Sequence, residues 1–164
     1  MLCPIENRPE TDILPMPARG PGLLVVDDDR ANRLGLAQDL TAAGFVVWTA
    51  PSGEVAVDTY LRHTGEIDAM LVSVALPDLP VAEFLGWLRR HYPGVPCCCL
   101  AGVNDQAAAA QVKAVGGLVV SHPISFHRLT AVIRRLILDA HPDGDAEEST
   151  FTEWQVVPGP SRAG

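Results

Sequence analysis

Short apolar runs alternate with longer amphipathic stretches through the middle of the chain. The runs hold few polar residues and lie at 23–26, 46–49, 69–75, 97–101 and 118–121. Strands that are apolar at nearly every position are typical of a parallel sheet that is covered on both faces. The pattern therefore predicts five buried strands.

Each predicted strand is followed by a stretch with helical periodicity. These stretches are 30–43, 52–62, 81–91, 104–115 and 125–139. Ser52 is a typical N-cap for the second, Gly44 follows the first as a C-cap glycine would, and Pro93 with Gly94 stops the third. Five strands, each followed by a helix, favour the α/β class, specifically a flavodoxin-like doubly wound five-stranded parallel sheet with strand order 2-1-3-4-5 and five helices. In this fold the functional site lies beyond the carboxyl ends of the strands.

The two flanks differ in composition from this core. Residues 1–22 hold five prolines without hydrophobic periodicity, which predicts a flexible leader. Residues 23–140 are the predicted domain, and the acidic stretch 141–164 is predicted to be a disordered tail. Within the tail, Phe151, Trp154 and Val156 form a short apolar patch. Two interpretations stay open for it: docking onto the domain or a partner, and a solvated tail.

Composition limits the classes of function. The chain has 164 residues, enough for one domain, and its formal net charge of -8 disfavours binding to nucleic acid. No apolar run is long enough to span a membrane, and the N-terminus lacks the basic start and apolar core of a secretory signal. We therefore expect a cytoplasmic protein that contacts neither membrane nor nucleic acid.

Three consecutive cysteines stand in the fourth predicted strand, at 97–99. Neighbouring residues of a strand point to opposite faces, so the three thiols are not placed to bind one metal ion. We expect them to act as small side chains that fill a buried strand.

Three acidic residues follow the first strand, Asp27, Asp28 and Asp29. Glycines and free amides stand at this point in dinucleotide-binding folds, so the aspartates disfavour such a site. Two interpretations remain open at this stage. The carboxylates either bind a hard cation such as Mg²⁺ or cap the first helix and interact with its dipole.

The order of these pieces resembles the response-regulator receiver family. The resemblance rests on LLVVDDDRANR, GFVVWTAPSGEVAV, IDAMLVSVALPDLP, VPCCCLAG and SHPISFHRL, and it covers roughly Leu23 to Leu138. It implies a two-component signalling domain that takes a phosphoryl group from a histidine kinase onto an aspartate with the help of Mg²⁺. The resulting change would be read by an output domain or partner through the fourth and fifth strands and helices.

The acceptor side of the implied site is incomplete. Asp27 and Asp28 match the acidic pair that holds Mg²⁺. Ser73 stands at the position of the phosphoaccepting aspartate, four residues before Pro77. A serine hydroxyl is neutral and weakly nucleophilic without a base, and two carboxylates alone satisfy Mg²⁺ poorly. We expect no required cofactor and at most a weak Mg²⁺ site.

Three further positions depart from the family pattern. Ala101 stands where the family has a Thr or Ser that binds the phosphoryl oxygen, and His122 stands where it has a charge-neutralising lysine. Val119 occupies the position of the switching aromatic residue, although the stretch before it is one residue shorter than usual. Losing a preorganised donor and a fixed positive charge removes most of what stabilises a transferring phosphoryl group.

These departures predict a pseudo-receiver, which is not an enzyme and works through protein contacts that do not require phosphorylation. The expected partner is a histidine kinase, an output protein or another receiver, including a homodimer through the fourth and fifth helices. An alternative is an active phosphorelay receiver that uses Asp78 or Ser73 as the acceptor. A small-molecule site at the same strand ends is a further alternative, which the three aspartates disfavour.

Overall fold

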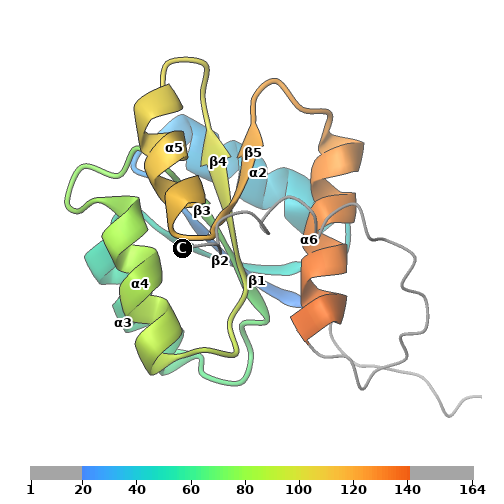
Figure 1. The fold of residues 1–164 in the computed structure, drawn as a ribbon. Helices are drawn as coiled ribbons and strands as arrows, with labels where there is room; N and C mark the ends of the chain where they lie inside the picture. The colour runs from blue at the N-terminus through green and yellow to red at the C-terminus, as the bar shows by residue number, and fades with distance from the viewer. Residues whose placement is uncertain (1–19, 141–164) are drawn as a thin grey trace, which may run out of the picture.

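The computed structural model of the protein describes residues 20–140. These residues form a single five-stranded parallel sheet with the order β2-β1-β3-β4-β5 and with helices on both faces (Figure 1). The predicted class, strand order and five βα units are confirmed. The strands are β1 (Gly22–Val26), β2 (Val46–Ala50), β3 (Ala69–Ser73), β4 (Cys97–Ala101) and β5 (Leu118–Ser121). The helices are α2 (Arg30–Ala42), α3 (Gly53–Arg62), α4 (Val81–His91), α5 (Gln106–Ala114) and α6 (Phe126–Ala140).

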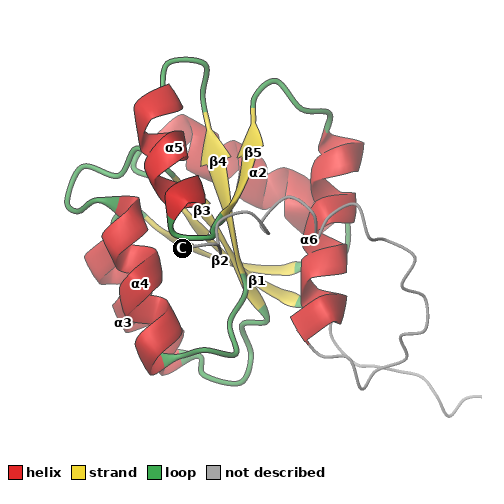
Figure 2. Cartoon of the chain, in the orientation of Figure 1, coloured by secondary structure: helices red, strands yellow, loops and turns green. Residues whose placement is uncertain are grey.

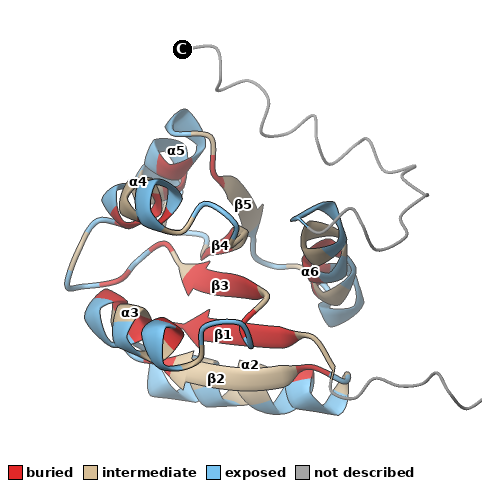
Figure 3. Cartoon of the chain, turned by 90° about the horizontal axis from the view of Figure 1, so that it is seen from below, coloured by how far each residue is buried: buried red, intermediate tan, exposed pale blue. Residues whose placement is uncertain are grey.

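The sheet, which has helices on both faces (Figure 2), separates two apolar cores. Alternate residues of each central strand point to opposite faces, so Leu24 and Val26 pack with α3, α4 and α5, whereas Leu23 and Val25 pack with α2 and α6. The inner strands β1 and β3 are buried, while the edge strands β2 and β5 are partly exposed (Figure 3). Burial on both faces explains why the strands carry apolar residues at nearly every position.

The cysteine strand follows the same alternation. Cys98 belongs to the core under α2 and α6, and Cys99 belongs to the core on the opposite face. Both thiols are buried, and burial raises the pKa of Cys99 to about 12 and that of Cys98 still further. The prediction of cysteines that fill a buried strand is confirmed for these two residues.

The helix ends follow the capping signals in the sequence. Ser52 precedes α3 and its hydroxyl accepts a hydrogen bond from the Val55 amide at 3.2 Å. Gly44 follows α2 with φ +105°, a left-handed backbone conformation that glycine adopts without strain. Both predicted helix boundaries are confirmed to within a residue.

Several boundaries differ from the prediction by one or two residues. Strand β1 begins at Gly22, inside the predicted leader, because Pro21 O accepts from Val46 N at 2.9 Å and ties this segment to β2. Strand β3 ends at Ser73 instead of residue 75. Helix α5 begins at Gln106 instead of residue 104, because residues 102–105 form a turn closed by Asp105 N and Gly102 O.

The remaining residues of the predicted leader, 1–19, and the tail at 141–164 lie outside the described residues, and so does the apolar patch around Trp154. Within 20–140, no helix is both long and apolar enough to cross a bilayer.

Candidate functional site

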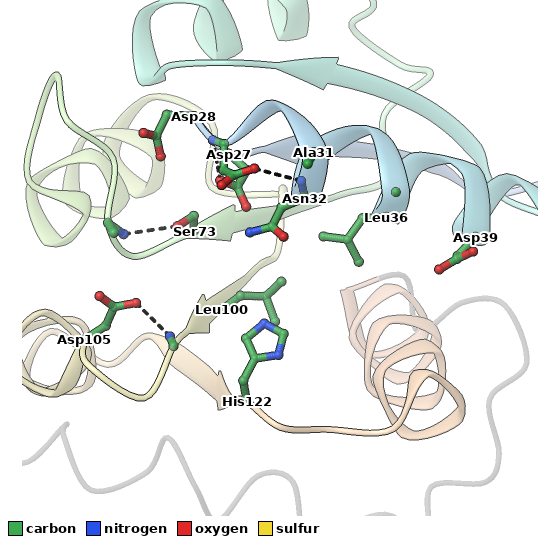
Figure 4. Close-up of a pocket in the computed structure, with 14 residues that line it drawn as sticks. Asp27, Asp28, Ala31, Asn32, Leu36, Asp39, Ser73, Leu100, Asp105 and His122 are labelled. Carbon is green, nitrogen blue, oxygen red and sulfur yellow. Dashed lines mark hydrogen bonds between the residues drawn. The ribbon is translucent and has the colours of Figure 1, made fainter.

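A cavity of about 480 Å³ opens at the carboxyl ends of the strands, beside β1, β3 and β4 (Figure 4). Its walls come from the β1–α2 loop, the first three turns of α2, the ends of β3 and β4, and the segment after β5. The lining residues are Asp27, Asp28, Asp29, Ala31, Asn32, Gly35, Leu36, Asp39, Ser73, Ala75, Leu100, Gly102, Asp105 and His122. Four of the positions predicted from the sequence therefore meet around one cavity: Asp27, Asp28, Ser73 and His122.

The sequence left two roles open for the three aspartates after β1, helix capping and cation binding, and the structure assigns capping to one of them. Asp29 is the N-cap of α2, and its carboxylate accepts from the Asn32 amide at 3.0 Å. Asp27 instead lies at the wall of the cavity, where Oδ1 accepts from the Asp29 amide at 2.9 Å. Asp28 lines the same cavity and is exposed to solvent. Capping explains Asp29 but not the other two carboxylates.

Asp27 is the one buried charged side chain in the described part of the chain, with 8% of its surface exposed. Burial raises the pKa of its carboxyl group, the Asp29 amide lowers it, and the charges of Asp28 and Asp29 raise it further. The Arg33 guanidinium lies nearby, but its Nη1 donates to the backbone oxygen of Asp27 at 2.8 Å and not to the carboxylate. The site therefore holds a carboxylate at a cost in stability, which is typical of functional positions.

Ser73 is the last residue of β3 and is half-buried at the cavity wall. Its Oγ accepts a hydrogen bond from the Ala75 amide at 3.2 Å. In the described part of the chain, no hydrogen bond joins this hydroxyl to a carboxylate or an imidazole. Without such a base, the hydroxyl is a weak nucleophile.

The three predicted positions in β4, in β5 and just after β5 fall into two groups. His122 lines the cavity, and its backbone amide donates to Ala101 O at 2.9 Å, which continues the pairing of β4 with β5. Ala101 is 2% exposed and packs into the core on the α3, α4 and α5 side, so its methyl group does not line the cavity. Val119 pairs with Cys99 across the two strands and packs against the same core.

The charges around the cavity are almost all negative. Five aspartates line it, and among the described residues no lysine or arginine does, so His122 is the one basic side chain in the wall. Preorganised positive charge and hydrogen-bond donors stabilise a transferring phosphoryl group, and this wall offers little of either.

The donor set only partly fits the Mg²⁺ that the sequence resemblance implies. Asp27 and Asp28 are hard oxygen donors, but one oxygen of Asp27 already accepts a hydrogen bond from an amide. The third side chain, Ser73, offers a neutral hydroxyl instead of a carboxylate. Within residues 20–140, no cluster of three or more His, Cys, Asp or Glu side chains is arranged to hold a metal ion. Because Mg²⁺ prefers near-octahedral oxygen ligation, this set does not form a complete cage.

Asp78, the alternative acceptor, lies outside the cavity wall. Its Oδ1 accepts from the Gly53 amide at 3.1 Å and its Oδ2 from the Glu54 amide at 3.2 Å. A carboxylate held by two amides at a helix N-terminus has a structural role in this structure.

Two cavity carboxylates, Asp39 and Asp105, were not identified from the sequence. Asp39 lies on the same face of α2 as Asn32 and Gly35, which also line the cavity. Successive steps of three or four residues along this predicted helix were the signal in the sequence that could have identified it. Asp105 stands just before an alanine-rich helix, where an acidic residue indicates an N-cap. Only the turn at 102–105 directs its carboxylate toward the cavity.

The sequence matches the family described as "Response regulator receiver domain" over residues 23–134. It is 32% identical to the response regulator MprA of Mycolicibacterium vanbaalenii over 149 residues, an alignment that covers 87% of this chain and 62% of that regulator. It is 30% identical over 118 residues to the transcriptional regulatory protein CusR of Escherichia coli, covering 70% of this chain and 50% of that protein. The chain thus spans between half and two thirds of the length of these relatives.

Solved structures agree on the fold. The full-length FixJ from B. japonicum superimposes with a TM-score of 0.69 at 26% identity, covering 77% of this chain and 62% of that one. A response regulator receiver domain protein from Clostridium thermocellum gives 0.68 at 20% identity, covering 74% and 98%. The response regulator TrrA from Thermotoga maritima, solved in complex with Mg(2+)-BeF, gives 0.62 at 22% identity, covering 71% and 98%.

Proposed function

The chain belongs to the response regulator receiver domain family, and we propose that it acts there as a pseudo-receiver, through protein contacts that do not depend on its own phosphorylation. The observation that carries this proposal is Ser73 at the end of β3, where the family places the aspartate that accepts the phosphoryl group. The hydroxyl lies at the cavity wall, accepts from the Ala75 amide and has no base beside it.

The surroundings of Ser73 support the same proposal. A phosphoryl group that entered the cavity would face five carboxylates and one histidine. His122 stands where the family has a charge-neutralising lysine, and no lysine among the described residues lines the cavity. The methyl group of Ala101 supplies no hydrogen bond and points into the core.

Mg²⁺ binding is proposed to be weak and not required. Asp27 and Asp28 are the residues that would hold the ion, whose chemical contribution in a receiver is to neutralise charge on the phosphoryl oxygens. Because Ser73 supplies a neutral hydroxyl in place of a third carboxylate, we expect the apparent affinity for Mg²⁺ to be low.

The proposed partner is a histidine kinase, an output protein or another receiver, and we place the protein in the cytoplasm with such partners. The contact surface is the edge formed by α5, β5 and α6 (Figure 1). Large apolar side chains are exposed at both ends of α5 and at the start of α6: Val103 (65%), Val115 (41%) and Phe126 (36%). We expect these exposed apolar side chains to contact a partner or a second copy of the chain.

Intact mass after incubation with Mg²⁺ and acetyl phosphate tests the proposal, with an ordinary receiver as the positive control. We expect no added phosphoryl group on this chain. An adduct would contradict the proposal and favour the alternative, a phosphorelay receiver that uses Ser73 or Asp78. Hydroxylamine would then distinguish the two, because it cleaves an acyl phosphate on Asp78 but not a phosphate ester on Ser73.

A further inference from the structure

The turn between β4 and α5 places a carboxylate of the chain itself on a backbone donor of the cavity. The Gly102 amide, at the end of β4, donates to Asp105 Oδ2 at 2.7 Å (Figure 4). Both residues line the cavity, and the Asp105 amide donates back to Gly102 O at 3.1 Å. The amide is therefore already bound to an anion that belongs to the protein.

Asp105 does not behave as an ordinary helix cap. It is the N-cap residue of α5, but its side chain accepts no hydrogen bond from the first turn of that helix. The other polar N-caps do: Asp29 accepts from Asn32 N, and Ser52 accepts from Val55 N. An aspartate at this position normally stabilises a helix through such a bond. Here the carboxylate turns back to the strand end.

Gly102 is the partner that permits this close approach. A Cβ atom built on residue 102 would lie 3.1 Å from Asp105 Oδ2 and 3.9 Å from its Cγ, a closer approach to the oxygen than nine in ten real Cβ contacts. A larger residue at this position would therefore push the Asp105 carboxylate away by a few tenths of an ångström.

The second amide at the cavity floor is also bound within the chain, because Ala75 N donates to Ser73 Oγ. Both amides that follow β3 and β4 in the cavity wall are thus satisfied by side chains two or three residues away. An anion entering from solvent would have to displace one of these bonds while facing the remaining aspartates.

We propose that Asp105 is the internal anion of this cavity: it binds the Gly102 amide, keeps external anions such as a phosphoryl group away from it, and holds the β4–α5 turn in one position. Asp105 is a positioning residue in this assignment and takes no part in any reaction. The inference rests on the proposed function, in which no phosphoryl group enters the cavity.

The test compares the Gly102 amide in the unmodified chain, in Asp105→Ala and in Asp39→Ala by NMR. Asp39→Ala is the matched control, since it removes the same charge from the same cavity wall without touching Gly102. We expect hydrogen exchange at Gly102 to accelerate by about tenfold or more in Asp105→Ala, as loss of a charged hydrogen bond implies, and to stay unchanged in Asp39→Ala. Asp105→Asn keeps an acceptor oxygen and should retain most of the protection.

Inorganic phosphate at constant ionic strength is the second readout. We expect it to shift the Gly102 resonance more in Asp105→Ala than in Asp39→Ala, although the two variants have equal net charge. Equal phosphate shifts in the two variants, or a Gly102 amide that stays protected in Asp105→Ala, would overturn the assignment. Both readouts use unphosphorylated protein, so labelling of the unmodified chain by acetyl phosphate would refute the proposed function without altering the result for Asp105.

Discussion

The carboxylate of Asp78 and the backbone amide of Gly53 are 25 residues apart in sequence and joined by a hydrogen bond of 3.1 Å. The neighbouring Glu54 amide donates to the other carboxylate oxygen at 3.2 Å. Asp78 thus supplements the Ser52 cap of α3 from a distant loop and fixes the segment after β3 against the start of that helix. A carboxylate engaged in this way is poorly placed to act as a phosphate acceptor.

Asp78→Ala should lower the free energy of unfolding by about 1–2 kcal/mol, the usual cost of losing a helix cap. Urea denaturation followed by circular dichroism measures this change. Asp78→Asn keeps one acceptor oxygen and should lose less. A denaturation midpoint unchanged in Asp78→Ala would contradict the structural role of this carboxylate.

Asp27→Asn should stabilise the protein at neutral pH, on the order of 1 kcal/mol, because functional carboxylates are held at a cost in stability. The pKa of Asp27 is raised above its ordinary value of 3.8 by burial, so the folded state binds a proton more readily than the unfolded chain does. Raising the pH through the interval between these two values therefore weakens the fold, and the full cost is present above it. The asparagine oxygen can still accept from the Asp29 amide.

The gain in Asp27→Asn should accordingly shrink as the pH falls toward and below 3.8. Thermal unfolding of both proteins across this range provides the comparison, and Asp28→Asn, at an exposed position, should gain less. A gain for Asp27→Asn that grew on acidification would show that burial of the charge is not its cause.

Ser73→Asp, Ala101→Thr and His122→Lys combined in one chain should restore labelling by acetyl phosphate in the presence of Mg²⁺. The aspartate supplies the nucleophile and a further ligand, the lysine supplies a fixed positive charge, and the threonine restores the hydroxyl that the family has at the end of β4. Intact mass measures the adduct, and circular dichroism checks the fold, because Ala101 is 2% exposed and threonine is larger. A folded triple variant that binds Mg²⁺ yet stays unlabelled would mean that these positions are not the receiver site.

Gly22→Ala should destabilise the protein by about 3 kcal/mol or more, because overpacking against backbone leaves little room to relax. A Cβ atom there would lie 1.8 Å from Glu66 O, and the Gly22 amide also donates to Asp68 Oδ2 at 2.7 Å. Gly94→Ala is the control, since a Cβ atom at residue 94 meets nothing within 4 Å. Equal denaturation midpoints for the two variants would contradict the close approach at Gly22.

Local patterns in the sequence were enough to determine the fold and the position of the site. Apolar runs such as 23–26 identify strands buried on both faces, and Ser52 and Gly44 mark helix ends, because these signals depend on residues near one another in the chain. The right-handed crossover rule then leaves few sheet orders, so the sequence alone predicts that the ends of β1, β3 and β5 lie at the same edge of the sheet. The aspartates after the first strand were identified by their place at a strand end, whereas the resemblance to the receiver family singled out Asp28, Ser73 and His122; these residues and Asp27 all line the cavity.

The tertiary structure decided which polar atoms bind one another. The sequence places Asp78 five residues after Ser73 but does not indicate that its carboxylate binds the start of α3, which depends on how two loops meet in space. Likewise, Asp105 stands before an alanine-rich stretch, where an aspartate normally caps a helix. Only the conformation of the 102–105 turn directs its carboxylate to the Gly102 amide. Hydrophobic burial follows a periodic pattern along the chain, whereas a hydrogen bond requires two atoms within about 3 Å at a suitable angle, and that condition is met only in the folded protein.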